Sequence, residues 1–358
     1  MGPTQYSLPA EWFPHVCTWL AWPHEQSDWP GKFEPIPHLY AEIVRLLVEA
    51  EAVRILVQPG QQAGVRRLLK ASAVDPARVS LIPLATDRSW IRDYAPIFVH
   101  GEHGAVVASD WVFSGWAKYR NWEADNAVPT RLARRLAKDG VTSEVISYLP
   151  ADGSPPRGVV LEGGAIDSNG AGCLLTTEQC MLSRKVQVRN PGMTREQLEE
   201  VFFEALGAAK VLWLGEGIAG DDTHGHVDDV ARFVDEQTIV ACVEPDPHDP
   251  NHGPLADNLK RMQSFRDARG RRFKVVKLPM PRPVVYAGQR LPASYANFYI
   301  ANGLVLVPQF NDPADTLALE TLAEAMPDRR VQGVYCRDLI LGLGALHCMT
   351  MQQPAAHG

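Results

Sequence analysis

The stretch VVLEGGAIDSNGAGCLLTT, residues 159–177, contains two short apolar runs that are joined by a turn-forming segment. The first run is Val159–Ile166 and the second is Cys173–Thr177. Between them, Asp167–Gly170 consists of residues that favour tight turns. Two apolar runs with such a turn between them predict a β-hairpin.

Three other stretches have the same order of run, turn and run. They are Ser89–Val99 with Ala105–Val112, His226–Val234 with Thr238–Val243, and Tyr295–Ile300 with Leu304–Pro308. The centres of the four turns, Glu102, Asn169, Glu236 and Asn302, follow one another at intervals of 67, 67 and 66 residues. A constant interval of this length indicates a repeated structural unit.

The segments between the hairpins have apolar residues at the three-to-four spacing of a helix. These segments are Pro37–Glu51, Pro129–Lys138, Thr194–Leu206, Leu255–Arg266 and Asp315–Ala325. Thr194 and Gln197 fit a capping box at the start of one helix. Strand-like runs follow most of the helices, at Val53–Val57, Ser143–Ser147, Val211–Leu214 and Phe273–Leu278. The repeated unit is therefore strand, turn, strand, helix, strand.

The 358 residues have room for about five such units. After Asn302 there is no room for another complete hairpin, so we expect Leu346–Met351 to pair with Thr18–Trp22. Such pairing closes a ring, as propellers do to protect the edges of their sheets. The sequence predicts one α/β domain over residues 1–358, a five-bladed α/β propeller. An open α/β sheet is the alternative.

Composition and charge narrow the class of protein. Hydrophobic residues make up 46% and charged residues 22%, which is typical of a globular chain. The net charge of −7 argues against a nucleic-acid partner. The longest apolar run, Leu339–Leu346, is far shorter than the ~18 residues of a membrane span, and the first sixteen residues do not resemble a signal peptide. We expect a cytoplasmic protein that binds neither nucleic acid nor a membrane.

Each hairpin begins with polar residues that are unusual in a strand. They are Trp90, Arg92 and Asp93 in the first, Glu162 in the second, and His226 and Asp228 in the third, while His347 and Cys348 stand in the carboxy-terminal run. Equivalent positions of a five-fold ring converge on its axis, so the set Asp93, Glu162, His226, Asp228 and Cys348 is expected to share one cleft. His347 is expected to point to the opposite face, with a structural or supporting role. His226 and Asp228 are two positions apart and are expected on one face of a strand.

This set of side chains fits chemistry on a cation. A thiolate such as that of Cys348 is a strong nucleophile, and a histidine such as His226 can give and take a proton. Three carboxylates around a thiol would raise its pKa, unless the substrate brings positive charge. A guanidinium is planar, cationic and pairs with carboxylates in a fork, so two aspartates could hold it facing the sulfur.

Two other classes of protein compete with this interpretation. The run from His224 to Asp229 resembles the H-x-H-x-D-H motif of binuclear zinc hydrolases, but its last position is Asp229 instead of histidine. We therefore expect neither a metal nor another cofactor. A non-enzymatic binding module would leave gaps among the five chemical residues, and the sequence has none.

Six ordered motifs carry a resemblance to a known family. They are SWIRDYAP (89–96), LEGG (161–164), GDDTHGHVD (220–228), NFYIANG (297–303), VPQF (307–310) and LHCMTMQQP (346–354). Together they resemble the agmatine deiminase family, which belongs with bacterial-type peptidyl-arginine deiminases in the guanidino-group-modifying superfamily. The resemblance covers essentially the whole chain.

The resemblance implies the pentein fold, a five-bladed α/β propeller, and a role for each site residue. It implies that Cys348 is the nucleophile, His226 the acid and base, and Glu162 the acid that binds the histidine and substrate. Asp93 and Asp228 correspond to the guanidinium clamps, and Trp90 to a tryptophan of the substrate pocket. The implied reaction converts agmatine to N-carbamoylputrescine and ammonia through a covalent Cys348 intermediate, in polyamine metabolism. A deiminase of free or peptide-bound arginine is the alternative, and a homodimer is expected by analogy.

Overall fold

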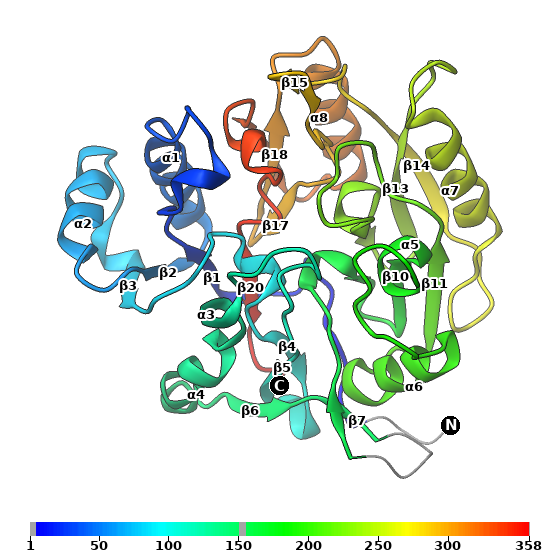
Figure 1. Ribbon diagram of the computed structural model, residues 1–358, viewed down its shortest axis with the longest axis horizontal. Coiled ribbons are helices and arrows are strands. Elements are labelled where there is room, and N and C mark those ends of the chain that lie inside the picture. The colour runs from blue at the N-terminus through cyan, green and yellow to red at the C-terminus, as the bar shows by residue number, and fades with distance from the viewer. Residues whose placement is uncertain (1–4, 150–154, 358) are drawn as a thin grey trace.

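Five small β-sheets surround the centre of the molecule, and most helices lie on its outside (Figure 1). The computed structural model describes residues 5–149 and 155–357. In each sheet the first two strands are antiparallel, and the third runs parallel to the second. This is the unit that the repeat predicts.

The sheets follow one another along the chain. Their strands are β4 (Ile97–His100), β5 (Val106–Asp110) and β6 (Thr142–Val145); β9 (Asp167–Ser168), β10 (Cys173–Thr177) and β11 (Lys210–Leu214); β12 (Ala231–Asp235), β13 (Thr238–Val243) and β14 (Lys274–Pro279); β17 (Tyr299–Ala301), β18 (Leu304–Gln309) and β19 (Arg330–Tyr335); and β20 (Met351–Pro354), β1 (His15–Ala21) and β2 (Ala52–Val57).

A helix connects the second strand of each unit to the third, as a parallel pair requires. These helices are α1 (Ile36–Ala50), α4 (Val128–Lys138), α6 (Arg195–Leu206), α7 (His252–Ser264) and α8 (Ala314–Ala325). All five predicted helices are present, with ends that differ by a few residues. The predicted capping box is also confirmed, because Thr194 accepts from the Gln197 backbone and the Gln197 side chain accepts from the Thr194 backbone.

The ring closes through strands from the two ends of the sequence. Trp19 pairs with Met351, Thr18 with Gln352 and Cys17 with Gln353, in an antiparallel ladder. The predicted closure is confirmed, but the strand begins at Met351 and not at Leu346. The residues before it form a turn in which the Met349 N–H donates to the Ala345 carbonyl, so they cannot take part in a ladder.

The first sheet contains an addition that the repeat does not predict. Helix α2 (Gln62–Ala71) leads to β3 (Val79–Pro83), which pairs with β2 and makes this sheet four-stranded. Short hairpins also occur outside the ring sheets, at β7 (Ser147–Tyr148) with β8 (Arg157–Gly158) and at β15 (Val285–Tyr286) with β16 (Gln289–Arg290).

The polar residues at the start of the hairpins lie in turns, which corrects their placement on strands. Three 3-10 turns, η3 (Ile91–Asp93), η5 (Gly163–Ala165) and η6 (Val227–Asp229), precede β4, β9 and β12. A 3-10 helix has about three residues per turn, so residues two apart point in different directions. His226 and Asp228 therefore do not share a strand face. The turns nevertheless place their side chains toward the centre, where they are buried.

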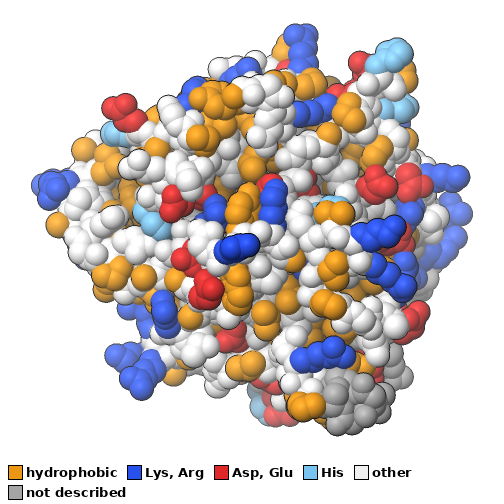
Figure 2. Space-filling model, viewed as in Figure 1, with side chains coloured by type: hydrophobic (Ala, Val, Ile, Leu, Met, Phe, Trp, Pro, Cys, Tyr) orange, Lys and Arg blue, Asp and Glu red, His pale blue; other side chains and the backbone are white. Residues whose placement is uncertain are grey.

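The surface around this centre is mixed in charge. Figure 2 shows basic and acidic side chains interspersed over the face that is seen in Figure 1. Among the described residues, no helix is long and apolar enough to cross a membrane.

Candidate active site

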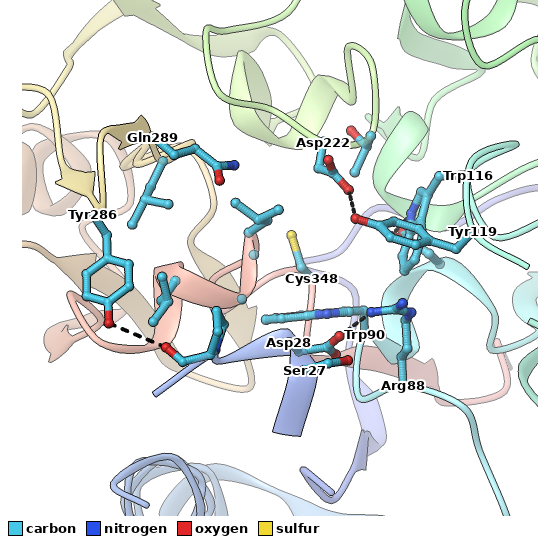
Figure 3. A pocket seen from close by; sticks show the side chains of 18 of the residues that line it. Ser27, Asp28, Arg88, Trp90, Trp116, Tyr119, Asp222, Tyr286, Gln289 and Cys348 are labelled. Atoms are coloured by element: carbon cyan, nitrogen blue, oxygen red, sulfur yellow. Dashed lines mark hydrogen bonds and ion pairs between the residues drawn. The ribbon is translucent and has the colours of Figure 1, made fainter. Parts of the chain in front are cut away.

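A cavity of about 540 Å³ opens at the centre of the ring, and Cys348 points into it (Figure 3). Asp93, Trp90 and Trp116 also line it, together with residues of the β15–β16 hairpin. The predicted site residues Cys348, Asp93 and Trp90 therefore share one cavity, although they come from distant segments. Trp90 rests on Trp29, with ring centroids 5.4 Å apart.

His226 lies buried behind this cavity, between two carboxylates. Its Nδ1 is 3.8 Å from Asp93 Oδ1, and its Nε2 is 3.8 Å from Glu162 Oε2. Among the described residues, neither ring nitrogen has a hydrogen-bond partner, and Glu162 Oε2 has none either. Burial favours the neutral ring, but Asp93, Cys180 and Glu162 together overcome it and raise the pKa of His226 well above its ordinary value. The ring is thus placed to hold a proton beside the cavity.

Gly164 explains how these groups can approach each other so closely. A Cβ atom at this position would lie 2.6 Å from His226 Nδ1, 2.9 Å from Asp93 Oδ1 and 3.0 Å from Asp228 Oδ2. Any side chain would therefore displace the predicted site residues. The Gly164 N–H also donates to Asp93 Oδ1 at 3.0 Å, and Trp116 Nε1 donates to Oδ2 at 2.9 Å.

Cys348 and Asp228 form a second group of predicted site residues, next to the group of His226, Asp93 and Glu162. The Cys348 thiol lies 3.7 Å from Asp228 Oδ2, and Asn297 Nδ2 donates to the sulfur at 3.1 Å. Asp228 Oδ1 is buried without a partner. All five predicted chemical residues are buried at the centre of the ring. Gly164 lies where these groups of residues meet, because a Cβ atom at this position would contact His226, Asp93 and Asp228.

The surrounding acids make this thiol hard to ionise. Burial, and then the charges of Asp228, Asp229 and Asp93, raise the pKa of Cys348 well above its ordinary value. Burial also raises the pKa of Asp93 to about 6, although the nearby His226 opposes it. A positively charged ligand in the cavity would favour the ionised form of both groups.

Glu162 is held in its ionised form from the side away from the cavity. Arg189 Nε donates to Glu162 Oε1 at 3.1 Å, and both side chains are fully buried. Burial opposes ionisation, but the Arg189 guanidinium and His226 overcome it and lower the pKa of Glu162 to about 2. The free Oε2 therefore carries negative charge toward His226.

Cys180 completes a cluster of potential metal ligands with two of these residues. One ligand atom from each of Glu162, Cys180 and His226 lies within 4.8 Å of the others. In the part of the chain that the structure describes, this is the cluster that forms, and the run from His224 to Asp229 does not assemble one. Asp229 instead accepts from Asn297 Nδ2 at 3.1 Å.

The outer wall of the cavity carries two more carboxylates, seen around Cys348 in Figure 3. Asp28 pairs with Arg88 through Oδ1, and its Oδ2 is buried without a partner. Asp222 pairs with Lys118 and accepts from the Tyr119 hydroxyl at 2.6 Å. Burial raises the pKa of Asp28 to about 7, against the effect of Arg88. Each carboxylate already has a basic neighbour.

Sequence reasoning missed several residues that touch the predicted ones: Asp28, Trp116, Cys180, Arg189 and Asn297. One of them had a usable signal. Asn297 precedes β17 just as Asp93 and Asp228 precede β4 and β12, so the repeat itself marks its position. Trp116, Arg189 and Asp28 lie in connections, to which the repeat assigns no structure.

A ring of five strand–strand–helix–strand units around a buried thiol, imidazole and carboxylates defines the class of pentein proteins. The comparisons agree on the fold. The structure of an agmatine deiminase from Enterococcus faecalis superimposes with a TM-score of 0.88 at 29% identity, over 100% of this chain and 99% of that one. A Cys-to-Ser variant of the C. jejuni agmatine deiminase with substrate bound gives a TM-score of 0.85 at 29% identity, over 98% and 97%.

The sequence comparisons identify the family. The model of the Porphyromonas-type peptidyl-arginine deiminases matches residues 7–354. The agmatine deiminase of Ectopseudomonas mendocina is 33% identical over 99% of this chain and 96% of its own, and that of Stutzerimonas stutzeri is 34% identical over 98% and 96%. The chain belongs to the Porphyromonas-type peptidyl-arginine deiminase family.

Proposed function

We propose that this protein is an agmatine deiminase that hydrolyses agmatine to N-carbamoylputrescine and ammonia. The observation that carries the proposal is the concentration of buried acids around one thiol, with unpartnered oxygens on Glu162 and Asp228. Unpartnered buried polar atoms are costly, and a guanidinium would supply donors to them. The full-length similarity to proteins named agmatine deiminase supports the same substrate.

In the proposed mechanism Asp93 and Asp228 hold the guanidinium group with its carbon facing Cys348. The bound cation offsets the negative charges that oppose ionisation of the thiol, so the thiol loses its proton to solvent once the substrate is bound and becomes the thiolate. The thiolate attacks the guanidinium carbon and forms a C–S bond. His226 then donates its proton to one amino group, the C–N bond breaks, and ammonia leaves.

The second half of the reaction removes the covalent amidino-thioether. The intermediate is still cationic, so Asp93 and Asp228 continue to hold it. The now neutral His226 takes a proton from water, and the hydroxyl attacks the same carbon. The C–S bond breaks, the hydroxyl proton passes to the departing sulfur, and the product carries a neutral ureido group. Glu162 keeps His226 oriented and stabilises its protonated form through both steps.

The outer wall of the cavity favours agmatine over arginine. Agmatine carries an ammonium group at its far end, and Asp28 offers an unpartnered, buried Oδ2 there. A free arginine would bring a carboxylate toward Asp28 and Asp222. Arg88 and Lys118 are already paired with these two acids, so they are poorly available to a second carboxylate.

The direct test is ammonia release from agmatine, free arginine and an arginine-containing peptide, each measured with purified protein. The expected result is release from agmatine, with N-carbamoylputrescine identified by mass spectrometry. A Cys348→Ser sample serves as the control for contaminating activity. Release from arginine or the peptide, but not from agmatine, would assign the protein to the alternative substrate.

A further inference from the structure

His347 lies between two carboxylates and touches both. Its Nδ1 is 2.7 Å from Asp228 Oδ2, and its Nε2 is 2.8 Å from Glu11 Oε2. The residue is only 1% exposed, so water does not compete for these bonds. The sequence predicts only a structural or supporting role for this histidine, next to Cys348.

Both carboxylates are surrounded by groups that keep them ionised. Glu11 Oε2 receives Arg232 Nη2 at 2.8 Å and lies 3.5 Å from Arg92 Nη2, while the Ile300 N–H donates to Oε1 at 2.7 Å. Burial opposes ionisation, but Arg232 and His347 lower the pKa of Glu11 well below its ordinary value. Burial also opposes ionisation of Asp228, but His347, with smaller contributions from His226 and Arg232, overcomes it and lowers the pKa of Asp228.

The protonation of the ring follows from these partners. An ionised carboxylate can only accept a hydrogen bond, and a neutral imidazole has a single N–H. Because both ring nitrogens face ionised carboxylates at hydrogen-bond distance, both must donate. His347 is therefore an imidazolium. Asp167 also faces this network and accepts from Arg232 Nε at 3.2 Å, and the Cys348 thiol lies beside Asp228. The charges of His226, Asp229 and Asp93 also act on Asp228.

This bond determines which oxygen of Asp228 remains free beside Cys348, at the back of the cavity. His347 takes Oδ2, which fixes the plane of the carboxylate and leaves the buried Oδ1 as its free acceptor. The His347 backbone is anchored as well, since its N–H donates to Asn297 Oδ1 at 3.0 Å. The same Asn297 side chain bonds the Cys348 sulfur.

We propose that His347 is a positioning residue of the deiminase: protonated and held by Glu11, it keeps Asp228 ionised and aims Oδ1 at the guanidinium. This proposal rests on the proposed function. It differs from a purely structural role in one respect. A structural histidine would affect how much protein folds, whereas a positioning imidazolium also affects how tightly the cation binds and at which pH.

The test is His347→Gln in the full chain, with kcat and KM for agmatine measured across a pH series. Glutamine can still fill the space and donate once, but it carries no charge. We expect KM to rise at least about tenfold, with a smaller change in kcat, because a charged hydrogen bond is lost. We also expect the acid limb of kcat/KM to become steeper and to extend to higher pH, because the pKa of Asp228 rises without the imidazolium and a second carboxylate then titrates beside Asp93.

Glu11→Gln provides a second variant that leaves the His347–Asp228 bond in place, and it decides the matter if His347→Gln does not fold. It should move KM and the acid limb in the same direction by a smaller amount. Glu51→Gln is the matched control. Glu51 is a buried carboxylate within 3.2 Å of His15 Nδ1, and it does not line the cavity. This control should lower the melting temperature but keep the wild-type KM and acid limb.

The outcomes separate this proposal from the proposed function. If wild-type protein releases no ammonia from agmatine, the function fails, and binding of guanidinium to the Cys348→Ala protein with and without His347→Gln still tests the positioning role. If the folded His347→Gln and Glu11→Gln proteins keep the KM and acid limb of the wild type, His347 is structural and the proposal is wrong.

Discussion

The two buried histidines at the centre of the ring differ in their partners. His226 lies between Asp93 and Glu162, and neither of its nitrogens has a hydrogen-bond partner. His347 lies between Asp228 and Glu11, and both of its nitrogens are bonded. An unpartnered buried polar group costs about 1–3 kcal/mol, so it is expected where a ligand completes the bonding. The comparison separates a region that is prepared for substrate from one that is already complete.

The largest effect is expected from removing the nucleophile, Cys348, in the region that is prepared for substrate. Cys348→Ala should lower ammonia release on the order of 10⁴-fold or more, because no other group can form the covalent adduct. Cys336→Ala is the matched control, since Cys336 is equally buried but lies outside the cavity. Turnover at the wild-type rate in Cys348→Ala would remove the basis of the mechanism.

Asp93→Asn should mainly weaken binding, with KM raised about 10- to 100-fold, because one charged hydrogen-bond acceptor is lost. The pKa of Asp93 is raised to about 6, so wild-type kcat/KM should fall as the pH drops below about 6. The raised pKa of Asp93 also makes the stability of the folded protein depend on pH. Its contribution to the free energy of unfolding is fully present below the ordinary pKa of 3.8 and is lost as the pH rises through about 6.

Asp93→Asn should therefore lose the limb near pH 6 in the activity profile, and its stability relative to wild type should be greater at pH 8 than at pH 4. Urea unfolding at the two pH values measures the second effect. If the limb near pH 6 stays in the variant, another group titrates there.

Arg189→Gln tests how much the buried ion pair between Arg189 and Glu162 contributes to stability. Removing one member of a buried ion pair typically costs about 3–5 kcal/mol of stability. The pKa of Glu162 is lowered to about 2, so its contribution to stability is present above the ordinary value of 4.5 and is lost as the pH falls through about 2. The variant should lose most of this contribution, which chemical unfolding at pH 7 would measure. A variant as stable as wild type at pH 7 would contradict this.

The smallest effect is expected at the outer wall. Asp28→Asn should raise the KM for agmatine only a few-fold, because burial raises the pKa of Asp28 to about 7 and only part of the protein carries this charge at neutral pH. A simple alkylguanidine without the far ammonium should be turned over equally by the variant and the wild type. An equal loss for both compounds would show that Asp28 acts on the shape of the cavity rather than on the ammonium.

The sequence predicts the ring better than it predicts the cavity. The 67-residue spacing and the apolar periodicity arise from units that each bury the same faces, so all five helices and the closure by β1 and β20 could be expected. Helix α2 and strand β3 could not, because they extend one unit without altering the spacing. The sequence predicts strands where the 3-10 turns occur, since three residues are too few to show a period.

The site residues show the same difference between positions that the repeat predicts and positions that it does not. Asp93, Glu162, His226, Asp228 and Cys348 all lie at the starts of repeated hairpins, so the repeat places them together. Trp116 could not be foreseen, because it approaches Asp93 from a loop with a left-handed backbone, at φ 56°. Glu11 could not be foreseen either. It lies 336 residues from His347 and reaches it only through the folded ring.

Cys348 lies three residues before β20, the strand that pairs with β1 and closes the ring. Detaching that strand from its neighbour would open the ring and carry the sulfur away from its histidine in one movement. Loss of reactivity and loss of closure should then coincide during denaturation. An assay of ammonia release would thus report whether β1 and β20, from the two ends of the chain, are still paired.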